Sequence, residues 1–349
     1  MTQLCENKQE VIFQWFGSII LLCMALVLIK MAGAFTAFNP QLQPTGYVAQ
    51  NEVSNFSLTS GNETVYMADY EKEFWSGNLH AYPISATGTV NFAAERWTLG
   101  AAASIDAQDY DTSRLIATMS DAGVQIPFRY ASLSVTQQAL FPATTINLFA
   151  ATGLNIVNFL RGDRSNEGPQ SLRMRDSVLG DNIHSRPYYV ADASYPTVFV
   201  SANDGMLHAI NTVNGQERWA YVPSMLLPKM LKLAKTYGNP VNPHDYFVDG
   251  QLNVAWVSSN SRRVLVGGLG GGGRGLYGLD VTGLSATVET NVAGGVAKKI
   301  LWEITPTKVN YASPTITNAY INLGYTYSTP LLSRTLTPKT VILFISNPI

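Results

Sequence analysis

Short apolar runs separated by turn residues fill most of this chain, and two of the stretches share one design. Residues 185–203 and 328–347 each contain Ser-x-Pro, an apolar strand, and a second apolar strand that starts ten residues after the proline and ends in asparagine. In the first copy the proline is Pro187 and the asparagine is Asn203. The pattern predicts two copies of one structural repeat built from short strands.

The first copy continues past Asn203 through turn residues that indicate antiparallel hairpins. Asp204-Gly205 is a tight-turn dipeptide, a second turn lies at Asn214-Gly215, and the next strand contains Trp219. A large aromatic residue at a fixed strand position is predicted to pack between sheets and to need one partner for its N–H group.

A third version of the pattern runs from residue 264 to residue 302. An apolar strand passes through a glycine run, 270–273, to a strand that ends at Asp280, and Trp302 follows after an insertion. Strand, glycine turn, strand, Asn/Asp turn and a strand with tryptophan are typical of a propeller blade. The prediction is therefore an all-β fold: a β-propeller with four-stranded antiparallel blades, short helical insertions, and an incomplete C-terminal part.

The bulk composition narrows the classes of function. The 349 residues are 46% apolar, which fits a folded protein. The formal net charge of −1 gives no positive electrostatic potential that would attract nucleic acid. Both cysteines, Cys5 and Cys23, lie near the N-terminus, so the rest of the chain can form neither a disulfide nor a thiolate metal site.

The N-terminal residues predict export. An apolar stretch covers 16–29, too short for a membrane span but suited to a signal peptide, and a small-x-small pattern ends at Ala34. Either cleavage after Ala34 or a retained N-terminal anchor places the remainder outside the cytoplasm. The expected organisation is 1–34 signal peptide or anchor, 35–70 linker, 71–178 a strand-rich segment leading into the propeller, and 179–349 a partial propeller.

Between the linker and the repeats the patterns are shorter. Strands are predicted within 74–79, 97–99, 114–118 and 126–130, and one helix over 151–160 from apolar residues at helical spacing. Charged residues from 161 to 181 indicate a solvated segment with local ion pairs. Residues 226–235 predict a short amphipathic helix.

The aspartates, histidines and glycines that could carry chemistry are mostly predicted to have structural roles, chiefly in turns. Asp204, Asp249 and Asp280 flank strands at positions where a carboxylate accepts bonds from nearby backbone N–H groups. The four histidines show no metal-ligand spacing, and His208 is predicted to be a satisfied core residue. The run 270–273 lacks the Lys-Ser/Thr of a phosphate loop and predicts a wide hairpin turn. Asp106, Asp109 and Asp111 are the nearest candidates for a calcium loop, although their spacing differs from that of an EF-hand.

Several motifs resemble the C-terminal β-propeller of the PilC/PilY family of type IV pilus biogenesis factors and tip adhesins. The resemblance covers roughly 70–349. The motifs, in chain order, are Leu-Gly-Asp-Asn-Ile-His-Ser-Arg-Pro at 179–187 with Asp181, Asn-Asp-Gly-Met-Leu-His-Ala at 203–209, Ala-Tyr-Val-Pro at 220–223, Tyr-Phe-Val-Asp-Gly at 246–250 with Gly250, the glycine run, and Gly-Leu-Asp-Val-Thr at 278–282.

The resemblance implies a non-enzymatic surface protein that promotes pilus assembly, controls retraction and mediates adhesion. Its implied partners are pilins or minor pilins, the assembly machinery, and a host or abiotic surface. Its implied location is the cell surface, pilus tip or outer membrane, reached through the periplasm. Family members place a large variable domain ahead of the propeller and carry a calcium loop in later blades. Neither is found in this chain, so we expect no bound cofactor here.

Two alternatives stay open at this stage. The chain ends on an apolar strand within 341–345, so it is either a truncated product without function or a sheet completed by a C-terminal partner chain. The other alternative is a quinoprotein-like dehydrogenase, because Asn211, Gly215 and Trp219 have the spacing of those propellers. Such enzymes commonly stack their cofactor against a disulfide, which the chain lacks after Cys23, so an enzyme is disfavoured.

Overall fold

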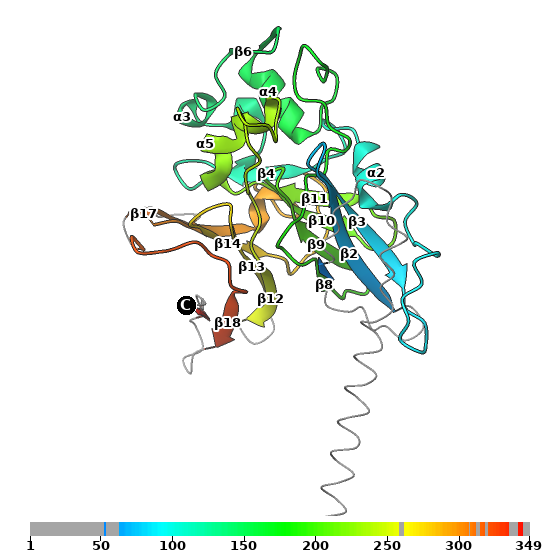
Figure 1. Cartoon of the computed structure of the whole chain (residues 1–349). Helices are drawn as coiled ribbons and strands as arrows, with labels where there is room; N and C mark the ends of the chain where they lie inside the picture. The colour runs from blue at the N-terminus through cyan, green and yellow to red at the C-terminus, as the bar shows by residue number, and fades with distance from the viewer. Residues whose placement is uncertain are drawn as a thin grey trace, which may run out of the picture.

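The computed structural model describes residues 52–53, 63–257, 262–306, 308–311, 315–317, 320–334 and 341–344. The predicted export segment, 1–34, lies outside the described residues. The fold is mostly β, as the sequence predicts, with helices gathered at one end (Figure 1). Among the residues described, no helix has the length and apolar content needed to cross a membrane.

Three sheets make up most of the structure. The first is antiparallel in the order β1-β2-β3. Its strands are β1 (Glu52–Val53), β2 (Thr64–Glu71) and β3 (Ser76–Pro83). Most of β2 falls in the stretch that the sequence assigns to a linker. The strand is nevertheless buried over nearly its whole length, because it is covered on both faces.

The second sheet has six strands in the order β5-β4-β11-β10-β9-β8. They are β4 (Ile116–Met119), β5 (Gln125–Pro127), β8 (Tyr188–Val190), β9 (Thr197–Ser201), β10 (Leu207–Asn211) and β11 (Glu217–Tyr221). Strands β8 to β11 form the predicted antiparallel meander. Strand β4 joins β11 in parallel, a pairing between segments about a hundred residues apart that no local pattern predicts.

The third sheet has six antiparallel strands in the order β12-β13-β14-β15-β16-β17. They are β12 (Leu252–Val257), β13 (Arg262–Gly268), β14 (Leu276–Asp280), β15 (Ile300–Ile304), β16 (Lys308–Tyr311) and β17 (Thr315–Thr317). Two hairpins complete the strands: β6 (Thr144–Ile146) with β7 (Phe149–Ala151), and β18 (Leu331–Arg334) with β19 (Val341–Phe344).

The predicted repeats are confirmed as hairpins. The 185–203 copy forms β8 and β9, and the 328–347 copy forms β18 and β19, which are also antiparallel. The meanders β8–β11 and β12–β15 agree in detail. Trp219 lies opposite Ala209, Trp302 lies opposite Gly278, and in each sheet a bulge follows directly after that position. The same side-chain placement thus recurs at the same point of each meander.

Each sheet buries side chains on both of its faces. In β9, Val198 and Val200 pack in a cluster with residues of β2, β3 and Trp97, whereas Phe199 packs in a larger cluster shared with the third sheet. The third sheet in turn packs Val264 and other residues of one face against Leu332 of β18. The alternation follows from the two-residue period of strands. Sheets are therefore stacked side by side, and in the described part of the chain they do not close into a ring.

The helices are α2 (Gly100–Asp106), α3 (Val135–Gln138), α4 (Gly153–Arg161) and α5 (Leu227–Met230), with 3₁₀ turns η2 (Tyr130–Ser132), η3 (Ser224–Leu226), η4 (Leu231–Ala234) and η5 (Ala297–Lys299). The predicted helix over 151–160 is confirmed as α4, which Thr152 caps and Gly162 ends with a positive φ of 121°. The predicted helix over 226–235 forms as three short pieces, η3, α5 and η4.

The prediction of a strand at 97–99 is wrong, and helices α2 and α3 were not predicted. Trp97 and Leu99 lie in a turn that leads into α2, and Leu99 has a φ of 64°. The first turn of α2 is held by Asn78 of β3, whose side chain accepts from the N–H of Ala102 and donates to the carbonyl of Leu99. Because this cap comes from a distant strand, no local capping signal marks the helix.

The prediction of a solvated segment with local ion pairs from 161 to 181 holds for Arg164 and Asp176, which are exposed, but is wrong for Arg161 and Arg175. Arg161 is fully buried and forms an ion pair with Glu289 at 2.8 Å. Arg175 is buried against the ring of Phe159 and pairs with Glu167 at 2.7 Å. These guanidinium groups leave water because they gain both an anion and backbone carbonyl acceptors. Two arginines of the charged segment are therefore part of the interior.

Candidate functional site

The turns that carry the family motifs meet at one place in the fold. The turn after β9 donates to the segment before β8: Asn203 gives its backbone N–H to the carbonyl of Asp181 at 2.8 Å and its side-chain amide to the carboxylate at 2.7 Å. Its amide oxygen accepts from the N–H of Phe247 at 2.8 Å. Gly271, in the β13–β14 turn, donates to the carboxylate of Asp249 at 3.1 Å. We call these four turns, with His184 and His244, the turn cluster.

Two of the glycines in the motifs are required by close backbone contact. A Cβ atom on Gly180 would lie 2.3 Å from the backbone nitrogen of Asp204, and one on Gly272 would lie 1.7 Å from the carbonyl oxygen of Phe247. No side chain can be accommodated at such distances from backbone atoms. The glycine run is thus a wide hairpin turn between β13 and β14, as predicted, packed against the 246–250 turn.

His184 and His244 each bond to a buried carboxylate of another turn. His184 Nδ1 lies 2.8 Å from Asp249, whose side chain is fully buried, and nearly half of the His184 side chain is exposed. His244 Nε2 lies 2.9 Å from Asp181, and both are largely buried. Burial raises the pKa of Asp249, and the contact with His184 opposes that rise. The two pairs join segments more than sixty residues apart.

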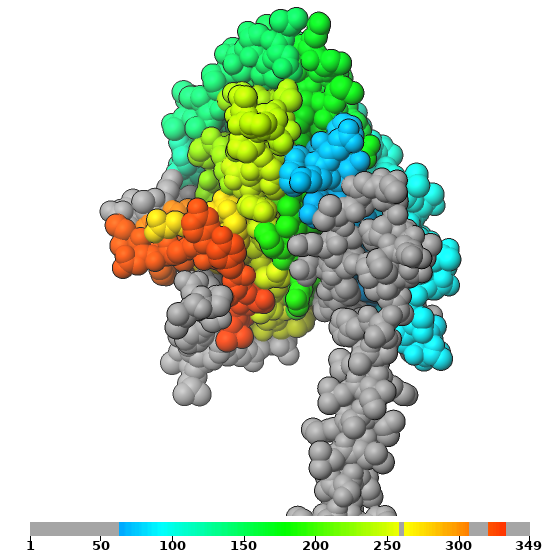
Figure 2. All heavy atoms as spheres, in the orientation of Figure 1, coloured from blue at the N-terminus to red at the C-terminus, as the bar shows by residue number. Residues whose placement is uncertain are grey.

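Aromatic rings surround His244. The indole of Trp75 stacks on the imidazole with centroids 3.7 Å apart, and Tyr246 meets it edge-on at 5.2 Å. Trp75 belongs to the turn between β2 and β3, so the first sheet also reaches the cluster. Figure 2 shows this turn, in blue, against the yellow-green segment that contains residues 225–250. The cluster therefore links the first, second and third sheets.

The residues that the sequence assigns to turns are placed as follows. Asp204, Asp249 and Asp280 accept from the backbone N–H groups of Met206, Gly271 and Thr282, so the predicted bonds are present. Gly205 has a φ of 95°, Pro187 directly precedes β8, and Gly250 packs against the backbone of Gly268. Trp219 is fully buried and donates to the carbonyl of Leu284 at 2.7 Å, and Trp302 covers Gly278.

The three candidate calcium ligands have separate protein partners. Asp106 accepts from Ser177 and from the N–H of Val178. Asp109 caps its own turn through Thr112, and Asp111 pairs with Arg129. Among the described residues, no group of three or more His, Cys, Asp or Glu side chains is arranged to hold a metal ion.

A buried charge network lies beneath the turn cluster and was not predicted as a unit. Glu217 accepts from Arg114 Nε and Nη2 at 2.9 and 2.8 Å and from His208 Nδ1 at 2.7 Å. His208 Nε2 lies 3.1 Å from Asp204. His208 is thus a satisfied core residue, as predicted. Burial lowers its pKa, but the two carboxylates outweigh burial and raise the pKa of His208 to about 9.

Replacing Asp181 by alanine is expected to lower the free energy of unfolding by about 1–3 kcal/mol. The substitution removes the acceptor of both the Asn203 amide and His244, and buried donors left without partners are costly. Urea denaturation measures the change. Asp192→Ala is the control, because Asp192 accepts only from backbone groups of its own turn. Equal losses in the two variants would show that the cluster adds no stability.

Comparisons with known proteins find matches over the part of the chain that holds most of the turn cluster. Residues 182–347 match the model of the PilY1 beta-propeller domain. The type IV pilus biogenesis factor PilY1 homolog of Xylella fastidiosa is 33% identical over 61% of this chain and 19% of its own length. The type IV pilus biogenesis factor PilY1 of Pseudomonas aeruginosa strain UCBPP-PA14 is 30% identical over 74% of this chain and 23% of its own length.

A solved structure also matches part of the chain. The crystal structure of the Pseudomonas aeruginosa PilY1 C-terminal domain has 29% sequence identity and covers 41% of this chain and 22% of that one, with a TM-score of 0.26. The chain spans about a fifth of the length of its curated relatives. The resemblance predicted from the motifs is confirmed: residues 182–347 match the PilY1 β-propeller domain, and the chain is similar to proteins named type IV pilus biogenesis factor PilY1.

Proposed function

We propose that this protein acts in the type IV pilus system as a non-enzymatic surface protein that promotes pilus assembly, takes part in the control of retraction and contributes to adhesion. The observation that carries the proposal is the match of 182–347 to the PilY1 propeller domain, together with relatives that are named type IV pilus biogenesis factors. The partners would be pilins or minor pilins, the assembly machinery and a host or abiotic surface.

A propeller form for 179–349 is part of the same proposal. Two successive meanders with the same bulge and tryptophan position support it, as do the hydrophobic clusters on either face of the second and third sheets. Blades that pack face to face around an axis need apolar side chains on both faces. The segment 71–178 would then lead into the propeller and also contribute β4 to its first complete sheet.

The ionisable groups of the turn cluster bond to other parts of the protein, which supports a role in protein contact rather than in catalysis. Asp181, Asp204 and Asp249 each accept from backbone or amide N–H groups and face a histidine. These contacts hold turns together, as structural carboxylates do. We further propose export through the periplasm to the cell surface, pilus tip or outer membrane, with no calcium bound by Asp106, Asp109 or Asp111. A calcium titration with heat release assignable to these residues would refute the last point.

Deletion of the gene in its host cell tests the pilus role. Deletion is expected to reduce the number of surface pili in electron micrographs and to reduce pilus-driven motility and attachment, and the wild-type gene should restore all three. A complementing gene that carries Trp219→Ala should fail, because it removes a core residue. Unchanged piliation, motility and attachment in the deletion strain would contradict the proposal.

A further inference from the structure

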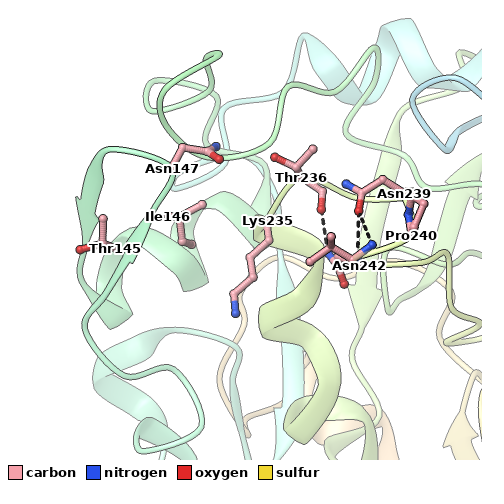
Figure 3. Close-up of a pocket in the computed structure, with 9 residues that line it drawn as sticks. Thr145, Ile146, Asn147, Lys235, Thr236, Asn239, Pro240 and Asn242 are labelled. Carbon is pink, nitrogen blue, oxygen red and sulfur yellow. Dashed lines mark hydrogen bonds between the residues drawn. The ribbon is translucent and has the colours of Figure 1, made fainter.

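A groove lies at the helical end of the molecule, lined by a loop that directly precedes His244 of the turn cluster. It has a volume of about 560 Å³ and separates the β6–β7 hairpin from the loop after η4. Figure 3 shows Ile146 and Asn147 on one side, Asn239 and Asn242 on the other, and the side chain of Lys235 extending between them. The remaining lining residues are Thr145, Thr236, Pro240 and Val241.

The loop wall is fixed by its own asparagines. Asn239 Oδ1 accepts from the backbone N–H groups of Val241 and Asn242, each at 2.9 Å. Asn242 Nδ2 donates to the carbonyls of Lys232 and Thr236, also at 2.9 Å. The Asn239 side chain thus holds the loop through its oxygen, and the Asn242 side chain through its nitrogen. The Asn239 Nδ2 donor and the Asn242 Oδ1 acceptor have no partner among the residues that the structure describes.

The hairpin wall is held in the same way. Asn147 occupies the turn with a φ of 55° and donates from Nδ2 to the carbonyl of Ser171, and the N–H of Leu148 donates to Gln170. Ile146 is buried beneath the turn, so the wall has a packed base. Both walls are held by hydrogen bonds within the chain, so the shape of the groove does not depend on a ligand, which lowers the ordering cost of binding.

The lining combines hydroxyl and carboxamide groups with one cation. Thr145 and Thr236 add hydroxyls, which both donate and accept, and Lys235 is exposed with no ion-pair partner among the described residues. No carboxylate lines the groove. Vicinal sugar hydroxyls each donate and accept, so they match this set, while the exposed Pro240 and Val241 offer apolar contact to ring C–H groups. We propose that the groove binds a carboxylate-bearing saccharide, with Lys235 pairing with the carboxylate.

Other classes of ligand fit the groove less well. Nucleic acid needs several cations along its backbone, and the lining supplies one. An acidic peptide could pair with Lys235. Its side chains lack neighbouring hydroxyls, so they would match the asparagine amides and threonine hydroxyls of the walls less well than a sugar does. The proposal concerns this groove alone and does not depend on the pilus role.

Isothermal titration of the full-length protein with three trimers tests the proposal. The probes are trigalacturonate, the neutral sugar maltotriose and the charge-matched peptide Asp-Asp-Asp. We expect trigalacturonate to bind about fivefold more tightly than either of the other two, and its affinity to fall as salt screens the ion pair. No heat from trigalacturonate at about 10 mM, or equal binding of the peptide, would overturn the proposal.

Variants assign the binding to the groove. Lys235→Gln is expected to weaken trigalacturonate binding about fivefold, the factor typical of an exposed ion pair, without changing the affinity for maltotriose. Thr145→Val should weaken both sugars about threefold through a lost hydrogen bond. Lys298→Gln is the matched control, because Lys298 is exposed on η5. If Lys235→Gln and Lys298→Gln behave alike, the groove is not the site.

Discussion

Replacing Glu217 by alanine is expected to lower the free energy of unfolding by about 3–5 kcal/mol. Its carboxylate accepts from Arg114 at two atoms and from His208 at a third, and all three side chains are fully buried. Removing the anion leaves Arg114 Nε and Nη2 and His208 Nδ1 in the interior without their acceptor, although Arg114 keeps the carbonyl of Arg161 and His208 keeps Asp204. The cost of breaking a buried pair lies in this range. Urea denaturation of the full-length protein measures the loss.

Two controls separate this effect from the loss of a side chain. Glu73→Ala removes an exposed carboxylate and should change stability by less than about 0.5 kcal/mol. Glu217→Gln keeps the side-chain volume and one acceptor oxygen, so the free energy of unfolding should fall by an amount between those of Glu73→Ala and Glu217→Ala. A Glu217→Ala variant as stable as Glu73→Ala would mean that the buried network contributes nothing.

The same network sets a dependence of stability on pH. The folded protein raises the pKa of His208 from 6.5 to about 9, because Asp204 and Glu217 outweigh its burial. Protonation therefore favours the folded state: the contribution, about 3 kcal/mol, is complete below pH 6.5 and is lost as pH rises through 9. His80 has a shift of the same sign, so the difference between wild type and His208→Gln isolates His208. Identical slopes in the two proteins between pH 6.5 and 9 would contradict the assignment.

Replacing Trp219 by alanine is expected to cost about 3–5 kcal/mol. The indole is fully buried, packs on Phe199 with centroids 5.7 Å apart, and donates to Leu284. Truncation leaves a cavity between the second and third sheets and an acceptor without its donor, and large-to-small changes of this kind have costs in this range. Thermal and urea unfolding both report the change.

Trp256 provides a matched tryptophan control. It lies on β12, is 41% exposed, and stacks on Arg263 at 4.5 Å. Trp256→Ala should cost less than about 1.5 kcal/mol, because partly exposed side chains lose less on truncation. The stability loss of Trp219→Phe should lie between those of Trp219→Ala and Trp256→Ala. Equal losses for Trp219→Ala and Trp256→Ala would show that the buried position carries no special weight.

The repeats were predictable because their signals are local. Asp204-Gly205 and the spacing from Pro187 to Thr197 specify turns and strand lengths that short-range sterics impose, and the structure places hairpins there. Helix α4 was predictable for the same reason, since its apolar spacing and Gly162 are neighbours in sequence. Helix α2 was not, because its cap is Asn78 of another element.

The candidate site was predictable residue by residue but not as an arrangement. Each turn aspartate could be assigned from its own neighbours. The pairing of Asp249 with His184 and of Asp181 with His244 depends on how the sheets stack, which no spacing encodes. The burial of Arg161 was missed for a related reason: exposure is the default for arginine, and its burial is made favourable by the distant Glu289 and by backbone carbonyls of other segments.

The parallel pairing of β4 with β11 has a consequence for the growing chain on the ribosome. Ile116 is synthesised about a hundred residues before Ala220, its partner in the sheet. At roughly 5–20 residues per second, the hairpin of β4 with β5 waits on the order of 5–20 seconds while the β4 edge that pairs with β11 has no partner strand. During that interval the apolar segment can bind chaperones, so we expect a chaperone to bind it early in the synthesis of the protein.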